Sequence, residues 1–172
     1  MLKFIVGIDP GITGALALVG LNDEGDVRLL DVQDMPVATL KVGRANKSHI
    51  LPSGVASILR DWNEHPFATS VDVFIEEVHA MPGQGVTSMF RFGHALGLVE
   101  GVAAGLGLRT HKVPPKTWQT AVRVQKEPDA GRLRASQIFP DGAKFFVRKM
   151  DHNRADAALI AYAGARLTQD PS

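Results

Sequence analysis

Cysteine is absent from this sequence of 172 residues, which excludes disulfides and thiolate-bound metal sites. Aromatic side chains make up only 6%, and no apolar run approaches the roughly 20 residues that span a bilayer. The opening Met1-Leu2-Lys3 precedes a strand pattern and lacks the features of a signal peptide. We therefore expect a cytoplasmic protein with no membrane partner, folded as one domain over residues 1–172.

A strong net charge is also absent, since the formal value is +1, but the charges are unevenly distributed. Residues 109–149 contain ten Lys or Arg and three Asp or Glu, a local charge of +7 that leaves −6 for the rest. This basic segment favours a polyanionic partner docked on one face of the protein. Chance clustering on a solvated surface is the alternative interpretation.

The apolar run at residues 4–8 is typical of a buried strand, and Asp9 follows it directly, ahead of Pro10-Gly11. A carboxylate at the end of a buried strand, beside a glycine turn, can meet a metal ion or a phosphate. An Asp-Pro-Gly turn can equally hold an Asp with a purely structural role. The opening residues alone leave both interpretations open.

A second buried strand is predicted at residues 71–75, and it also ends in acid, at Glu76-Glu77. Because side chains alternate along a strand, only one of these two glutamates can face the same site as Asp9. Two buried strands that are distant in sequence thus each end in a carboxylate.

The remaining strand patterns are shorter, and one stretch has no pattern. We expect a meander in which the segments at 15–19 and 27–33 follow the first strand antiparallel, and a last strand at 109–113. Residues 36–52 show no sustained period and are predicted to form a loop.

Four helices are predicted in the middle of the chain, the last of which contains Leu133, Ile138 and Phe139 and ends at Pro140. Ser53 is expected to cap the first, and Pro115 to open a short third one. The second, at residues 87–106, has apolar side chains around most of its circumference, so we expect burial on more than one side or a dimer interface. Phe90 and Phe92 are interpreted as core residues in this helix.

An alanine-rich helix is predicted to begin near residue 152 and to run to about Arg166. Its first turn presents Asp156 together with His152, one turn earlier, or less favourably with Asn153 or Asp151. Ordinary helix capping would also account for an acid or amide at this place.

Acidic and imidazole side chains from two strand ends and a helix start form a set of hard ligands, suited to Mg²⁺ or Mn²⁺. Two such ions, about 3.5–4 Å apart, can clamp the attacking and leaving oxygens in phosphodiester hydrolysis. The basic segment would bind the nucleic acid backbone. One chemistry therefore accounts for both the carboxylates and the uneven charge.

Several motifs, in this order and spacing, resemble the RuvC Holliday junction resolvases of the RNase H-like superfamily, and more narrowly the RuvC-like proteins of phages and prophages. They are Gly7-Ile8-Asp9-Pro10-Gly11, the run from Glu76 to Gly85, Val113-Pro114-Pro115-Lys116-Thr117-Trp118 and Arg154-Ala155-Asp156-Ala157.

The resemblance implies an α/β fold with an RNase H-like mixed five-stranded sheet of order 3-2-1-4-5, strand 2 antiparallel, flanked by helices. It further implies a homodimer that makes paired, metal-dependent nicks in branched, four-way (Holliday) DNA and leaves 5′-phosphate and 3′-hydroxyl ends.

The resemblance places Asp9, Glu76 and Asp156 on the family's carboxylates. We assign His152 as the fourth ligand, with Asp151 and then Asn153 as the other candidates, and expect two Mg²⁺ or Mn²⁺ ions: one on Asp9 and Asp156, one on Asp9 and Glu76. The DNA backbone is expected to contact five cationic side chains: Lys116, Lys126, Lys144, Arg148 and Lys149.

Two alternatives stay open. The incomplete fourth ligand fits a branched-DNA binding module with little or no catalysis. The turn at residues 7–14 also resembles the phosphate-binding turn of sugar kinases and actin-like ATPases, but those proteins need a second lobe of this kind.

Overall fold

The computed structural model describes residues 1–43, 45–77, 79, 83 and 85–169. Half of the ten-residue motif from Glu76 to Gly85 (residues 78, 80–82 and 84) lies outside the described residues. The strands are β1 (Leu2–Asp9), β2 (Ala15–Leu21), β3 (Val27–Asp34), β4 (Val37–Val42), β5 (Ala45–Ile50), β6 (Ala68–Glu76) and β7 (Arg109–Val113). The helices are α1 (Pro52–Asn63), α2 (Val86–Gly105), α3 (Pro115–Ala121), α4 (Ala130–Ile138) and α5 (His152–Gln169), with 3-10 helices η1 (Pro140–Phe146) and η2 (Lys149–Asp151).

Five strands form one mixed sheet in the order β3-β2-β1-β6-β7. β2 runs antiparallel to both β1 and β3, whereas β6 runs parallel to β1 and β7. Numbered without the β4–β5 pair, this is the predicted order 3-2-1-4-5, which is confirmed. β1 is the central strand because its apolar side chains are buried on both faces, as expected for a strand covered by helices on either side.

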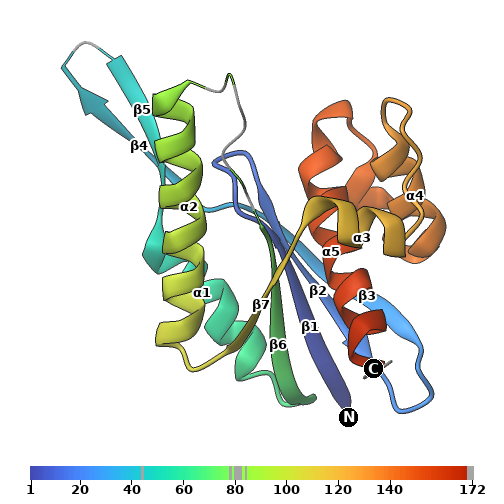
Figure 1. Cartoon of the computed structure of the whole chain (residues 1–172). Coiled ribbons are helices and arrows are strands. Elements are labelled where there is room, and N and C mark those ends of the chain that lie inside the picture. Colours follow the sequence, from blue (N-terminus) through green and yellow to red (C-terminus); the bar gives the residue numbers. More distant parts are fainter. Residues whose placement is uncertain (44, 78, 80–82, 84, 170–172) are drawn as a thin grey trace.

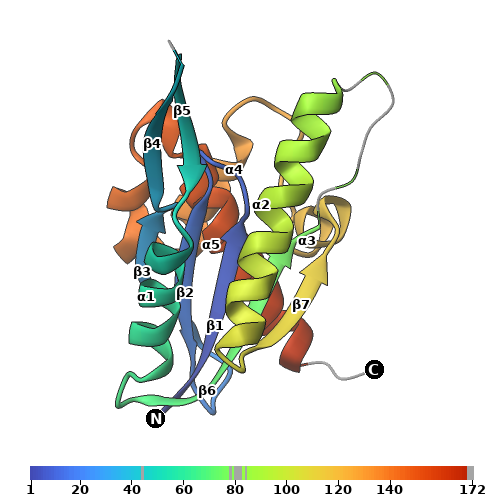
Figure 2. The same cartoon turned by 90° about the vertical axis from the view of Figure 1, so that its left-hand side faces the viewer.

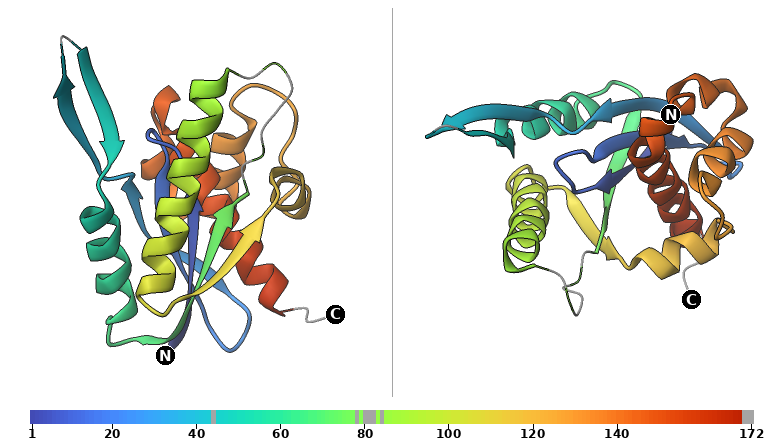
Figure 3. Two further views of the ribbon diagram at one scale, coloured as in Figure 1. Left: turned by 60° about the vertical axis from the view of Figure 1, so that its left-hand side comes forward. Right: turned by 90° about the horizontal axis from the view of Figure 1, so that it is seen from above.

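Helices cover both faces of this sheet, α3, α4 and α5 on one and α1 and α2 on the other (Figures 1 and 3). The alternation of side chains sorts β1 between two cores. Ile5 packs in the core that includes α5, whereas Phe4, Val6 and Ile8 pack in the core that includes α1 and α2. Asp9, two residues beyond Gly7 and four beyond Ile5, therefore belongs to the α5 face.

β1 and α5 touch through their backbones at Gly7. A Cβ atom at this position would overlap the carbonyl oxygen of Ala157 and the backbone nitrogen of Ala161. Ala157, Ala158 and Ala161 are fully buried, so the alanine-rich sequence of α5 is explained by this close approach to the sheet. The contact fixes the first turns of α5 against the strand that ends at Asp9.

Residues 36–52 do not form the predicted loop. β4 and β5 pair antiparallel over six residue pairs, from Val37↔Ile50 to Val42↔Ala45, and extend from the main sheet as a two-stranded hairpin (Figures 1 and 2). The prediction was wrong because both faces of this ribbon are largely exposed, so the sequence shows no apolar period.

Two further expectations about helices were wrong. α1 begins at Pro52, so Leu51 occupies the N-cap position and Ser53 lies inside the first turn, where it does not cap the helix. In α2 the buried residues are Ala95, Val99 and Ala103. Phe90 and Phe92 are 73% and 42% exposed, so they are not core residues of this chain.

Among the described residues, no helix is long and apolar enough to cross a membrane.

Candidate active site: a cluster of carboxylates

The sheet presents Asp9 and Glu76 at the carboxyl ends of two neighbouring parallel strands. On β6, Val71, Val73 and Ile75 pack towards α1 and α2, whereas Phe74 packs towards α5. Alternation therefore directs Glu76, two residues beyond Phe74, to the same face as Asp9, and it directs Glu77 away. The sequence-based ambiguity between the two glutamates is thereby resolved in favour of Glu76.

Asp156 completes the cluster from the second turn of α5, the helix that packs on this face. The carboxylates affect one another electrostatically. Burial, and next the charge of Glu76, raise the pKa of Asp9 to about 6. Burial and the charges of Asp9 and Glu76 raise the pKa of Asp156 to about 7. Burial also raises the pKa of Glu76. Because these three acids resist being ionised at the same time, a bound cation would stabilise the site.

Groups around Asp9 oppose this rise of its pKa. The backbone N–H of Gly11 donates to Asp9 Oδ1 at 3.4 Å, and this bond lowers the pKa of Asp9. The electrostatic interaction with His152 lowers the pKa of Asp9 as well. The Asp-Pro-Gly turn thus holds the Asp9 carboxylate while leaving it directed at the cluster.

The contacts of the three candidates for the fourth ligand differ. Asp151 is buried and accepts bonds from Arg148 Nε at 2.9 Å and Arg148 Nη2 at 2.7 Å, so its charge is already neutralised. Asn153 donates its side-chain amide to the backbone oxygen of Thr13. His152 is exposed, and its Nδ1 lies 3.4 Å from the backbone oxygen of Lys149. These contacts favour His152.

No three Asp, Glu or His side chains of the described part of the chain form a ready-made metal cluster. The carboxylates nevertheless raise one another's pKa values. The missing three-residue cluster and the raised pKa values are compatible if two carboxylates bind each cation. The remaining ligands of the cation would then be oxygen atoms from outside the protein. Mg²⁺ sites are commonly built in this way, from few carboxylates together with substrate phosphates.

Trp118 is a site residue that the sequence analysis missed as a partner of the carboxylates. Its buried ring packs in the core on the α5 side, and its indole N–H donates to Glu76 Oε1 at 2.9 Å. This bond opposes the rise in the pKa of Glu76. The sequence contained one signal for this role: Trp118 lies in α3, directly after β7, and β7 pairs with β6.

We expect Trp118→Phe to keep the core packing but to raise the pKa of Glu76 further, because the hydrogen bond to its charged form is lost. The pH at which activity reaches half its maximum should move upward, and the rate on the alkaline side should be nearly retained. A pH–rate profile of the variant beside wild type measures this shift. An unchanged profile would show that the indole N–H does not control Glu76.

One of the five predicted DNA-contacting residues, Lys149, lines a cavity beside Asp156. A hollow of about 600 Å³ is lined by Asp156, His152, Lys149, Trp118 and residues of the connection from α3 to α4. Lys116 and Lys126 are exposed on α3 and on that connection.

Two other predicted DNA contacts engage neighbours within the chain. Lys144 places its ammonium 5.3 Å from the ring centroid of Phe145. Arg148 is bound to Asp151 and is thus less available to a phosphate than the sequence suggested.

The known proteins that resemble this chain in sequence or in structure include several Holliday junction resolvases. No family model matches the chain. Residues of this chain are 32% identical over 94 positions to the Holliday junction resolvase MOC1, chloroplastic, of Chlamydomonas reinhardtii; this covers 51% of the chain and 10% of that protein. The chain thus spans about a tenth of the length of this curated relative.

Solved structures match over nearly the whole chain. Thermus thermophilus RuvC in complex with a Holliday junction substrate has a TM-score of 0.65 at 19% identity, covering 97% of this chain and 96% of the other. The yeast mitochondrial Holliday junction resolvase Ydc2 has a TM-score of 0.57 at 17% identity, covering 96% and 78%. The chain therefore has the RuvC type of RNase H-like fold, as its motifs predicted.

Proposed function

We propose that this chain is a divalent-metal-dependent endonuclease that recognises branched DNA and resolves four-way junctions by paired nicks. The observation that carries the proposal is the meeting of Asp9, Glu76 and Asp156 on one face. Burial raises the pKa of all three, and the charges of neighbouring carboxylates further raise the pKa of Asp9 and of Asp156. The similarity to RuvC and Ydc2 in fold, and to MOC1 in part of the sequence, supports the same conclusion.

The chemistry of the donor set fits Mg²⁺ or Mn²⁺, because carboxylate oxygens are the ligands these hard cations prefer. Asp9 would be shared by two such ions, with Asp156 as a further ligand of one and Glu76 as a further ligand of the other, and His152 would be the fourth ligand residue. Bound there, such ions supply positive charge to the scissile phosphate and to the water that attacks it.

The protein itself positions these groups. Gly11 holds one oxygen of Asp9, and Trp118 holds one oxygen of Glu76. The products would carry 5′-phosphate and 3′-hydroxyl ends.

A second copy of the chain is the partner we propose for α2. Phe90, Gly93, Gly97, Gly101 and Ala104 follow helical spacing, and all five are exposed. Nothing described within 4 Å would meet a Cβ atom at Gly93, Gly97 or Gly101, so another backbone can approach this stripe closely. Two copies would supply the two sites that paired nicks need.

The proposal is tested with end-labelled DNA of matched sequence in three forms: four-way junction, fork and linear duplex, each with Mg²⁺ or Mn²⁺. We expect paired nicks in the junction, slower cleavage of the linear duplex, and products that a ligase can reseal. Binding without nicking in both metals would instead establish a branched-DNA binding module. Equal cleavage of all three forms would contradict structure selectivity.

A further inference from the structure

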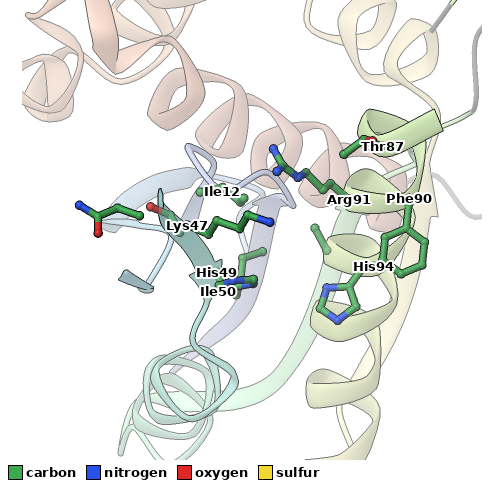
Figure 4. Close-up of a pocket in the computed structure, with 11 residues that line it drawn as sticks. Ile12, Lys47, His49, Ile50, Thr87, Phe90, Arg91 and His94 are labelled. Atoms are coloured by element: carbon green, nitrogen blue, oxygen red, sulfur yellow. The ribbon is translucent and has the colours of Figure 1, made fainter. Parts of the chain in front are cut away.

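A second concave surface lies between the β4–β5 hairpin and α2 (Figure 4). This hollow of about 490 Å³, here called the hairpin groove, is lined from the hairpin by Lys47 and His49, from α2 by Arg91 and His94, and from the β1–β2 turn by Ile12. It does not share a lining residue with the cavity beside Asp156.

The charge of the hairpin groove has one sign. Lys47 extends from the hairpin towards α2, and Arg91 extends from α2 towards the hairpin (Figure 4). None of its described lining residues is acidic, and the sequence contains no Asp or Glu in residues 35–52 or 86–99. Two cations that face one another without a counter-charge repel, so this arrangement favours an anion between them.

The position of the groove connects it to the carboxylates. Ile12, at its inner end, lies three residues after Asp9, within the same turn. The groove lies on the side of the sheet that α1 and α2 cover, whereas the segment at 109–149 contributes α3 and α4 on the other side (Figure 3). An extended polyanion at Asp9 could therefore contact basic side chains on both sides of the cleavage site.

We propose that the hairpin groove binds the sugar-phosphate backbone of one arm of the DNA substrate, with Lys47 and Arg91 as the phosphate contacts. The inference rests on the proposed function, because it takes DNA as the substrate. A second copy of the chain is a poorer occupant. Its own groove would be equally positive. Of the stripe proposed for dimerisation, Phe90 lines the groove, whereas Gly93, Gly97, Gly101 and Ala104 do not.

The test compares binding of a labelled four-way junction by wild type and by the double variant Lys47→Ala/Arg91→Ala over a series of salt concentrations. Ca²⁺ replaces Mg²⁺, to neutralise the carboxylates with slower cleavage. Each lost phosphate contact should reduce the slope of log K against log salt by about 0.9, so the double variant should lose about two units. We expect about 10- to 100-fold weaker binding at moderate salt.

Two control proteins separate this effect from a general loss of charge or of fold. Arg60→Ala/Arg166→Ala removes two exposed cations from α1 and α5 outside the groove, and it should bind like wild type. Lys47→Arg/Arg91→Lys keeps both charges and should restore most of the salt slope.

The outcomes are distinct. Wild-type binding with an unchanged slope in Lys47→Ala/Arg91→Ala would overturn the groove proposal and leave the proposed function standing. If sedimentation shows that the double variant has lost a dimer that wild type forms, the groove is an interface between copies, and the proposal is again overturned. Failure of wild type to bind any DNA would remove both the groove proposal and the proposed function.

Discussion

Asp9→Asn is expected to slow nicking of a four-way junction by about 10³-fold or more, while binding of the junction persists. The side chain of Asn is nearly isosteric and can still accept the N–H of Gly11. It lacks the negative charge that a shared ligand of two cations needs. Because Asp9 is central to the proposed pairs with Glu76 and Asp156, its loss should weaken both at once.

The measurement is single-turnover cleavage of a labelled junction, with a gel-shift titration of the same protein. Asp23→Asn is the matched control, since it removes one exposed carboxylate from the β2–β3 turn, where it contacts none of the cluster. Nicking by Asp9→Asn at the wild-type rate would refute the assignment of the active site. Loss of binding together with nicking would mean that Asp9 supports the fold or the DNA surface.

The second large effect concerns stability. Without divalent cations, Asp156→Asn should be more stable than wild type at pH 8, by up to about 4 kcal/mol, because one unit of pKa corresponds to about 1.4 kcal/mol. The folded-state pKa of Asp156 is about 7, against an ordinary value of 3.8. Between these two values the folded protein retains a proton that the unfolded chain has released.

The sign follows from this difference in bound protons. The free energy of unfolding of wild type loses the contribution of Asp156 as the pH rises through its folded-state pKa, and Asp9 acts in the same direction. The variant has no such group, so the two proteins should be similar at pH 4 and should diverge by pH 8. The pKa values of Asp34, Asp72 and Asp151 are lowered, so these residues make the free energy of unfolding rise with pH. They do so equally in wild type and in the variant, and therefore do not affect the comparison.

Urea unfolding at pH 4, 6 and 8 measures the divergence, and Mg²⁺ provides a second readout. A cation that binds only the folded protein should stabilise wild type at pH 8 and stabilise Asp156→Asn much less. Equal stability of the two proteins at every pH would show that neither burial nor the neighbouring carboxylates raise the pKa of Asp156.

The sequence predicted the parts of this structure that follow from burial and chain direction. The strands that end at Asp9 and Glu76 are apolar on both faces, so their continuous hydrophobic runs identified them, and parallel pairing then placed both acids at one edge. Alternation alone left Glu76 and Glu77 open, and the motif resemblance chose Glu76. The structure adds the physical reason, because Phe74, two residues before Glu76, joins the core on the α5 side.

The missed elements share a different physical cause. The β4–β5 hairpin has little apolar surface to bury, so pairing between its own backbones defines it and hydrophobic periodicity does not. The sequence suggested one basic region at 109–149, yet Arg148 there is occupied by Asp151, while Lys47 and Arg91 lie in a groove that only the tertiary structure assembles. Charge counted along a chain does not reveal ion pairs or surfaces built from distant segments.

The contact of Gly7 with α5 has a consequence for how the protein tolerates change. Main-chain atoms touch there, so the separation of the segments that carry Asp9 and Asp156 does not depend on the size of an intervening side chain. Substitutions on the hairpin, on α2 or around the cavity beside Asp156 can therefore alter the proposed DNA contacts, while the spacing of Asp9 and Asp156 stays the same. Substrate preference can in this way diverge among related sequences without retuning the chemistry.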